Sequence, residues 1–254
     1  DAQEAIFWEA EQHVPFDIDD VCLDFQVLKE DVGANQMEIL LVAAKKEMVN
    51  THADLIRDAG YNPVIIDVDS FAVQNAYGES LDAPWTQVTG LINIGSDVTN
   101  INIVQNHIPL FTRDLSVGSN AFNESLQREL GVSFDEAEEM ISGGGAMPDE
   151  GRCREIIAEA SEELSMGIER SISFLKTAGD AENIDEVVMS GGGGRVPWLR
   201  EILADKHQIE FKLNDSLRAF SQADSLISEG MEELEKVAPL LTVSLGLALR
   251  KVGK

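Results

Sequence analysis

The sequence predicts a mixed α/β fold in which helices cover the faces of a sheet, of the ribonuclease-H-like kind. Three strand-like segments joined by short turns lie between residues 88 and 115. A succession of helix, strand, helix and strand follows between residues 152 and 212. Hydrophobic residues make up 44% of the 254 residues, which is sufficient for a large packed core. This order of elements is typical of half of such a sheet.

The first part of the chain predicts a small α+β unit followed by a connecting segment. Alternating apolar residues indicate strands, and apolar residues three or four apart indicate helices. The expected elements are a helix over 2–12, a hairpin of strands over 20–28 and 38–44, a helix over 45–59 that ends at Gly60, a short buried strand over 63–68, and a helix from Asp69 or Ser70, either of which would cap it, to about residue 77.

The remainder predicts a larger unit. A polar connector over 78–86, with Pro84, is the expected boundary. The short links GSDV and QNH predict that the three following strands form an antiparallel meander. The expected elements are strands over 88–94, 99–104 and 108–115, helices over 118–130 and 134–141, one long helix over 152–176, a strand over 186–189, a helix over 197–207, a strand over 209–212 and a C-terminal helix over 234–251.

Composition excludes several classes of function. The chain has 19 Lys and Arg against 46 Asp and Glu, a formal charge of −27, which argues against nucleic acid or an anionic membrane as a direct partner. The most apolar stretch, 239–249, is too short to span a bilayer, and no signal peptide is visible. Cys22 and Cys153 are expected to be reduced, buried thiols. The histidines lack metal-ligand spacing.

Two glycine-containing turns are candidates for chemistry. Asn93 to Thr99 reads as a hairpin tip whose backbone N–H groups and hydroxyls could cradle a phosphate, although alone it is better explained as an ordinary turn. Ser190 to Gly194 joins a buried strand to a helix, an arrangement that lets backbone touch a ligand. Four glycines cost conformational entropy, which favours a ligand site here. The run is neither a Walker A loop nor a dinucleotide fingerprint.

A third stretch surrounds the predicted helix at 134–141. Ser133 and Glu136 have the spacing of a capping box. Glu138 could reach a sugar hydroxyl, although a solvated helix face is the more common role of such a residue. The sequence contains no recognisable nucleophile motif.

Taken in order, eight segments resemble the actin-like ATPase superfamily, and within it most resemble the PilM family of type IV pilus assembly proteins. The segments cover almost the whole chain. They are EAEQHVPFDIDDVCLDFQVL, ILLVAAKKEMV, AGYNPVIIDVDSFAVQNA, LINIGSDVTNINIVQNHIPLFTRDLSVG, GVSFDEAEE, ERSISFLK, VVMSGGGGRVPWL and VSLGLALRK. The resemblance implies an actin-like fold divided into an inserted α+β subdomain over 1–62, the remainder of the first lobe over 63–86, and a second lobe over 87–254.

The resemblance also implies a nucleotide site for ATP and Mg²⁺. The second phosphate-binding hairpin would contain Asn93, Gly95, Ser96 and Thr99. The adenosine-binding turn would contain Gly191, Gly192 and Gly193, and Glu138 falls where relatives contact the ribose. A catalytic residue is not identified.

Partners and location follow from the same resemblance. The first lobe would hold the N-terminal tail of a membrane-anchored PilN-like protein, within a complex of other pilus inner-membrane and motor components. The protein would therefore be cytoplasmic and peripheral at the inner membrane, without inserting into it.

Departures from the family pattern limit the expected activity to that of a weak ATPase at most. The first phosphate loop is absent, and together with Asp1 at the start this indicates a fragment lacking N-terminal sequence. Asn93 stands where many relatives have Asp, and an amide brings no charge to Mg²⁺. Ile141 stands where relatives often have Lys, and Ser119 follows Gly118 where relatives have a second Gly.

Alternatives remain open at this stage. Asp69 lies where hydrolytic relatives orient water, but a helix N-cap is the preferred interpretation. The chain could instead be an FtsA-like or type II secretion actin-like protein, or an interaction module that binds no nucleotide.

Overall fold

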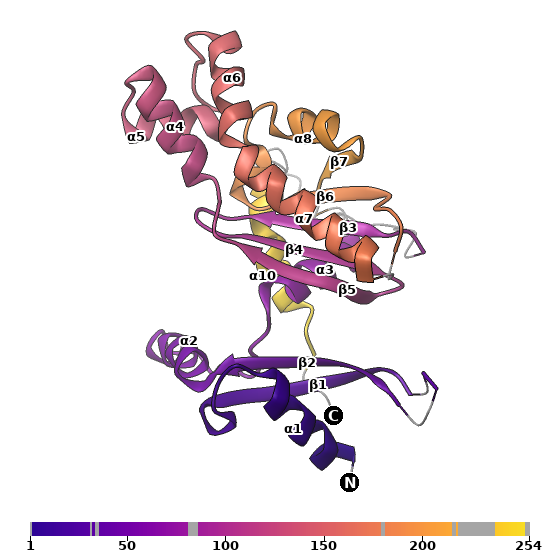
Figure 1. Ribbon diagram of the computed structural model, residues 1–254. Helices are drawn as coiled ribbons and strands as arrows, with labels where there is room; N and C mark the ends of the chain where they lie inside the picture. Colours follow the sequence, from indigo (N-terminus) through magenta and orange to yellow (C-terminus); the bar gives the residue numbers. More distant parts are fainter. Residues whose placement is uncertain are drawn as a thin grey trace, which may run out of the picture. The chain divides into compact units, whose positions relative to one another are not determined.

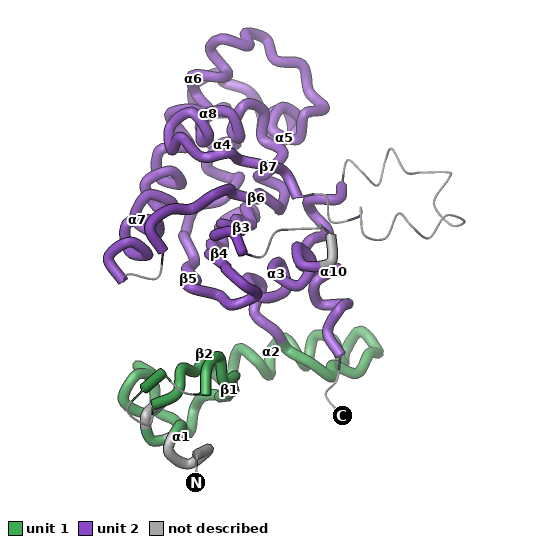
Figure 2. Tube along the Cα trace, turned by 90° about the vertical axis from the view of Figure 1, so that its right-hand side faces the viewer, with its two compact units in different colours: residues 1–66, 252–254 green, residues 67–251 purple. Residues whose placement is uncertain are grey.

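The computed structural model describes residues 2–30, 32–33, 36–80, 86–178, 181–214, 217 and 237–251. The chain forms two compact units, which Figure 2 colours separately. Unit 1 comprises residues 1–66 and 252–254, and unit 2 comprises residues 67–251. The sequence predicts a different division, into an inserted subdomain over 1–62, the rest of the first lobe over 63–86 and a second lobe over 87–254. That division into lobes stays a prediction.

Unit 1 is a hairpin with helices before and after it. Helix α1 (Ala2–His13) and the short 3-10 helix η1 (Ile18–Asp20) precede strands β1 (Val21–Lys29) and β2 (Glu38–Lys45), and helix α2 (Lys46–Asp58) follows. The two strands pair antiparallel, as their alternating apolar residues predict. Cys22 is exposed on β1, so the expectation of a buried thiol is wrong for this residue, whereas Cys153 is buried.

Unit 2 is built on a mixed sheet with the strand order β5-β4-β3-β6-β7 (Figure 1). The meander consists of β3 (Thr89–Ile94), β4 (Thr99–Gln105) and β5 (Ile108–Leu115), which pair antiparallel as predicted. Strand β6 (Glu186–Ser190) lies parallel to β3, and β7 (Glu210–Leu213) lies parallel to β6. The parallel pairs require crossover connections, which the helices supply.

Helices cover the two faces of this sheet. One face carries Ile92 and Ile101 and packs under α7 (Glu162–Ala178) and α8 (Leu199–His207). The same core continues beyond the sheet into α4 (Asn120–Leu130), α5 (Phe134–Ile141) and α6 (Glu150–Ala160). The opposite face carries Leu91, Val104 and Val188 and packs against α3 (Asp69–Ser80) and α10 (Thr242–Ala248). Successive strand residues point to opposite faces, so each strand contributes to both cores.

Helix α3 is oriented by contacts at its two ends. Near its start, the Asn102 side-chain amide donates to the Ser70 carbonyl at 3.1 Å. Near its end, the Tyr77 hydroxyl donates to Glu186 at 3.2 Å. Glu186 is the first residue of β6. Asn102 on β4 pairs with Leu91, which in turn pairs with Val188, so Asn102 lies level with a residue nearer the carboxyl end of β6. The N-terminus of α3 therefore points toward the carboxyl ends of β3 and β6.

Two predicted elements differ in the structure. The long helix over 152–176 is divided at Ser161, whose hydroxyl bonds back to the Ala158 carbonyl and which separates α6 from α7. The C-terminal helix is shorter than expected, because a 3-10 turn, η3 (Ala238–Leu241), precedes α10. Residues 234–236 lie outside the described residues.

Residues 63–68 are not a strand. Val64, Ile65 and Ile66 are exposed, and no described strand pairs with them. Helix α3 then begins at Asp69 itself, and Val68 supplies the first helical carbonyl, which accepts from Ala72 at 3.0 Å. Asp69 is thus the first residue of the helix and not its N-cap, although a carboxylate there still favours the helix dipole.

Candidate functional site

The candidate site lies where β3 and β6 end. The turn between β3 and β4 is closed by a hydrogen bond from the Gly95 N–H to the Val98 carbonyl at 2.9 Å. A Cβ at position 95 would lie 2.9 Å from the same carbonyl, so glycine allows this tight turn. The remaining residues of the turn, Ser96 and Asp97, are exposed at its tip.

The start of α4 fixes this hairpin from one side. The backbone N–H groups of Ser119 and Asn120 donate to the carbonyls of Gly95 and Ser96 at 2.8 and 2.9 Å. A Cβ on Gly118 would lie 2.4 Å from the Ser96 carbonyl oxygen. The close approach thus requires a glycine at 118, whereas the following position accepts Ser119.

Asp97 is held as a charged group. Its carboxylate accepts hydrogen bonds from the Asn120 side chain at 2.8 Å and from the Ser96 hydroxyl at 2.9 Å. These bonds, the one from Asn120 first, lower the pKa of Asp97. The tip therefore presents a carboxylate, which suits a cation better than a bare phosphate.

The glycine run after β6 packs directly on the end of β3. Gly191 has φ of +80°, and a Cβ there would lie 2.3 Å from the Ile94 carbonyl oxygen. A Cβ on Gly193 would lie 2.2 Å from the Ile94 side chain. At Gly192 the nearest atom would be 3.4 Å away, so this position has room. Two of the glycines predicted as a ligand turn are thus also required by packing.

The N-terminus of α3 points to the same end of the sheet. The Ser70 hydroxyl is buried and has no hydrogen-bond partner among the described residues, and Asp69 beside it is exposed. A helix N-terminus favours anions, since its first N–H groups are unsatisfied. In a chain with a charge of −27, backbone amides and this dipole are the natural sources of positive potential.

The polar side chains predicted at the hairpin occupy different environments. Asn93 is half-buried, and its Oδ1 accepts from the Ser190 hydroxyl at 3.2 Å. Thr99 is fully buried, and its hydroxyl donates to the Val117 carbonyl at 2.7 Å. The Thr99 hydroxyl is therefore committed to holding the hairpin, while Asn93 lies at the junction of the two turns.

Glu138 lies on α5, whose capping box of Ser133 and Glu136 forms as predicted. The Glu138 carboxylate accepts from Asn123 Nδ2 at 2.7 Å. Asn123 is fully buried, and among the described residues no donor reaches its Oδ1. Glu138 is exposed, so its carboxylate is the part of this pair that a ligand hydroxyl could reach.

Arg195 connects this region to the glycine turn. Its guanidinium donates to the Ser142 carbonyl, just after α5, at 2.7 Å. Both residues line a cavity of about 360 Å³ together with Gly194 and Trp198. The structure thus brings the glycine turn and the end of α5 together, although they are far apart in sequence. Sequence reasoning did not single out Arg195 or Asn120; only the position of Arg195 directly after the glycines could have indicated it.

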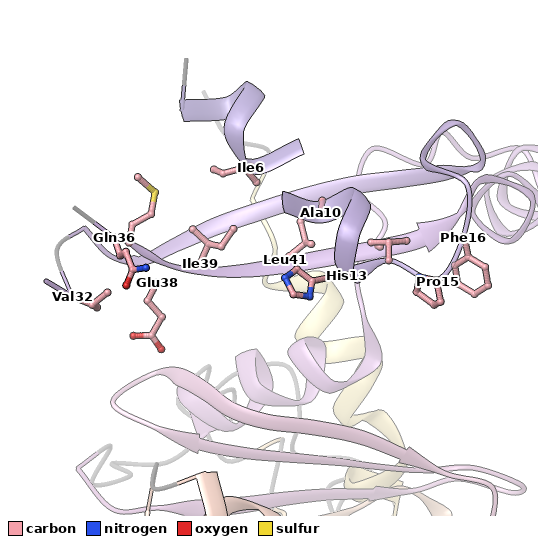
Figure 3. Close-up of a pocket in the computed structure, with 13 residues that line it drawn as sticks. Ile6, Ala10, His13, Pro15, Phe16, Val32, Gln36, Glu38, Ile39 and Leu41 are labelled. Carbon is pink, nitrogen blue, oxygen red and sulfur yellow. The ribbon is translucent and has the colours of Figure 1, made fainter. Parts of the chain in front are cut away.

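Unit 1 contains a separate apolar groove of about 1100 Å³ (Figure 3). Its floor is formed by Ile39 and Leu41, alternate residues of β2, and its wall by Ile6 and Ala10 of α1. Polar residues border the apolar surface, among them His13, Gln36 and Glu38. A groove with an apolar floor and polar borders suits an apolar peptide segment.

The described residues offer neither a membrane span nor a cluster of metal ligands. None of the helices in these ranges has the length and apolar character needed to cross a bilayer. Within the same ranges, no three His, Cys, Asp or Glu side chains are grouped as metal ligands.

The mixed sheet, the hairpin and the glycine turn define an actin-like α/β fold. Solved structures support this class. The ethanolamine utilization protein EutJ from Carboxydothermus hydrogenoformans matches 81% of this chain and 62% of its own at 16% identity and a TM-score of 0.59. MreB5 of Spiroplasma citri bound to AMPPNP matches 75% of this chain and 66% of its own at 16% identity and a TM-score of 0.54.

The particular family follows from two more specific matches. The family model of the type IV pilus assembly protein PilM matches residues 2–252. The structure of a PilM-PilN type IV pilus biogenesis complex matches 100% of this chain and 73% of its own at 27% identity and a TM-score of 0.79. This chain belongs to the PilM family.

Proposed function

We propose that this protein is an ATP-binding scaffold of the type IV pilus assembly machinery, which holds the N-terminal tail of a PilN-like membrane protein. The observation that carries the nucleotide part is the convergence of three features at one end of the sheet. The glycine turn after β6 and the N-terminus of α3 favour an anion through backbone N–H groups and a helix dipole. The β3–β4 hairpin adds the Asp97 carboxylate, which suits the cation that accompanies a nucleotide.

The residues divide into positioning and contacting groups in this proposal. Gly95, Ser96 and Asp97 form the tip that would approach phosphate and a bound Mg²⁺, while Thr99 holds the tip in place. Gly192 would face the nucleoside, because the neighbouring glycines are packed on Ile94. Glu138, which is exposed and positioned by Asn123, would receive sugar hydroxyls. Bound Mg²⁺ would neutralise phosphate charge.

The same residues favour binding over rapid hydrolysis. Asn93 is neutral where a carboxylate would attract the metal ion, so its oxygen would accept only from a metal-bound water. Asp69 works in the opposite direction, because it is exposed at the start of α3, forms no hydrogen bond among the described residues and could orient water for slow turnover. We infer an ATPase that is weak at most, whose nucleotide would set the affinity for the partner tail.

The groove of unit 1 is the proposed seat of the partner tail. Its apolar floor would take apolar side chains of an extended or helical tail. The matching structure's description as a PilM-PilN complex supports PilN as the class of partner. Through this partner the protein would lie in the cytoplasm at the inner membrane, near the other components of the pilus machine.

ATP binding is tested by calorimetry in Mg²⁺ on the wild type and two glycine variants. At Gly192 and Gly151 the nearest atom to an added Cβ is 3.4 Å away, and neither position has positive φ. Both positions therefore accept a Cβ without a backbone clash. We expect Gly192→Leu to abolish ATP binding and Gly151→Leu, at the start of α6, to leave it unchanged. Wild-type protein that binds no ATP would refute the nucleotide part.

Tail binding is tested by fluorescence anisotropy with a labelled peptide of the PilN partner's N-terminal tail. Leu41→Asp places a charge on the groove floor and is expected to weaken binding at least tenfold, because the carboxylate would be desolvated. Leu55→Asp is the matched control, because Leu55 is 66% exposed on α2. If Leu55→Asp weakens binding and Leu41→Asp does not, the tail docks on α2 and the groove assignment is wrong.

A further inference from the structure

A row of four polar side chains crosses the sheet at the candidate site. Ser190, Asn93, Asn100 and Asp114 lie directly opposite one another on β6, β3, β4 and β5. Register partners carry their side chains on the same face, which here is the face covered by α3. The row therefore runs from the glycine turn to an edge strand of the sheet.

Each neighbouring pair in the row is hydrogen-bonded, and all the bonds run in one direction. Asn100 Nδ2 donates to Asp114 Oδ1 at 2.8 Å, and Asn93 Nδ2 donates to Asn100 Oδ1 at 3.1 Å. The Ser190 hydroxyl then donates to Asn93 Oδ1 at 3.2 Å. Every donor in the row thus points toward the carboxylate.

The direction follows from the chemistry of Asp114. An ionised carboxylate only accepts hydrogen bonds, so Asn100 must face it with Nδ2 and must turn Oδ1 the other way. Asn93 can bond to that oxygen only through its own Nδ2, which leaves its Oδ1 toward Ser190. A neutral residue at 114 would allow both amides to flip. One exposed charge, two strands away, therefore determines the orientation of the Asn93 amide.

We propose that Asp114 is a positioning residue that, through Asn100, makes Asn93 present its carbonyl oxygen to the glycine turn. The position of Gly191 supports this, since a Cβ there would lie 2.9 Å from Asn93 Oδ1. Resting on the proposed nucleotide function, the inference assigns the row a ligand chemistry: Oδ1 accepts from a water of a nucleotide-bound divalent cation. Asn93 carries no negative charge of its own. Asp114 supplies part of that charge indirectly, because the hydrogen bonds that link it through Asn100 to Asn93 polarise one another.

The row also explains why a carboxylate at 93 would be disfavoured. In an Asn93→Asp variant, one oxygen would face Asn100 Oδ1, and flipping Asn100 would turn that oxygen toward Asp114 instead. An acceptor meets an acceptor in either case. Adding Asp114→Asn removes the conflict, since Asn100 then donates to the new carboxylate and the amide at 114 donates to Asn100.

A double-mutant cycle on the intact protein tests the inference without any ligand. Unfolding in urea is measured for the wild type, Asn93→Asp, Asp114→Asn and the double variant N93D/D114N. We expect Asn93→Asp alone to raise the unfolding equilibrium constant about fivefold, because two acceptors then face each other. Asp114→Asn alone should change it little, because the amide oxygen at 114 can still accept from Asn100, and the double variant should return close to the wild-type value. If the two single effects simply add in the double variant, Asp114 does not orient Asn93 and the inference is wrong.

ATP calorimetry tests the role of Asp114 in nucleotide binding. Asp114→Asn is expected to weaken ATP binding about fivefold in Mg²⁺ and to leave binding unchanged in EDTA. Glu124→Gln is the charge-matched control, an exposed acid on α4 outside the row, and is expected to change neither. An equal loss in Glu124→Gln would show a general charge effect and overturn the inference. If the wild type binds no ATP, the proposed function fails, and the unfolding cycle alone decides whether Asp114 positions Asn93.

Discussion

Gly246 is the position where the packing of α10 on α3 can be tested most sharply. An added Cβ would lie 1.7 Å from the Ala72 carbonyl oxygen and 2.4 Å from its carbon. The clashing atoms are helix backbone, so no side-chain rotation relieves them. The helices would have to separate by more than about 1 Å, which opens the closely packed core around Val73 and Tyr77.

The magnitude of Gly246→Ala follows from two opposing effects. Overpacking of this severity costs about 3 kcal/mol or more. Alanine is favoured over glycine inside a helix by about 1 kcal/mol. The free energy of unfolding should therefore fall by about 2 kcal/mol or more.

Two other helical glycines provide a graded control series. Gly151→Ala meets nothing closer than 3.4 Å and should be neutral or stabilising. Gly167→Ala would meet the Leu115 methyl at 2.3 Å, a side-chain end that can rotate away, so its cost should be intermediate. Urea denaturation followed by circular dichroism measures all three. If Gly246→Ala is as stable as Gly151→Ala, the two helices do not approach this closely and the reasoning is wrong.

Three further predictions concern ionisable groups. Burial, followed by the charge of Lys206, lowers the pKa of the His207 imidazole from 6.5. The stability that the neutral imidazole contributes is therefore fully present above pH 6.5 and is lost as the pH falls through the pKa of the folded state. This loss of unfolding free energy should be smaller in His207→Gln when unfolding is measured as a function of pH. Asp67 has a side chain only 4% exposed and accepts two hydrogen bonds from the Arg250 guanidinium, which is 42% exposed. Asp67→Ala should lower the free energy of unfolding in urea by about 1.5 kcal/mol, because the arginine left behind remains hydrated, and an unchanged value would show that the pair does not stabilise the fold. Asn120→Ala should raise the pKa of Asp97 in a carbon-13 titration, and no change would exclude their hydrogen bond.

Local signals explain why much of the fold was predictable. The meander over 88–115 was confirmed because alternation and two short turns leave few other pairings for adjacent strands. The prediction failed at 63–68, where β-branched residues favour extended backbone. An extended segment becomes a strand only when a neighbour accepts its hydrogen bonds, and the described residues provide none.

The candidate site was only partly predictable, because its contacts join segments that are far apart in the sequence. The glycines at 191 and 193 were visible as a run, but their contact with Ile94 depends on the parallel pairing of β3 with β6. The bond between Arg195 and the Ser142 carbonyl joins segments about 50 residues apart. No local pattern encodes such a contact.

The sequence by itself determined the family, the order of most elements and the two turns, because these depend on residues near one another in the chain. Tertiary structure alone decided the direction of α3, the groove of unit 1 and the polar row that ends at Asp114. Hydrogen-bond direction across strands is set by register, and register is a property of the assembled sheet. Asp114 shows this most clearly. This exposed acid on β5 can orient the Asn93 amide only because the register of β5, β4 and β3 places Asn100 between them.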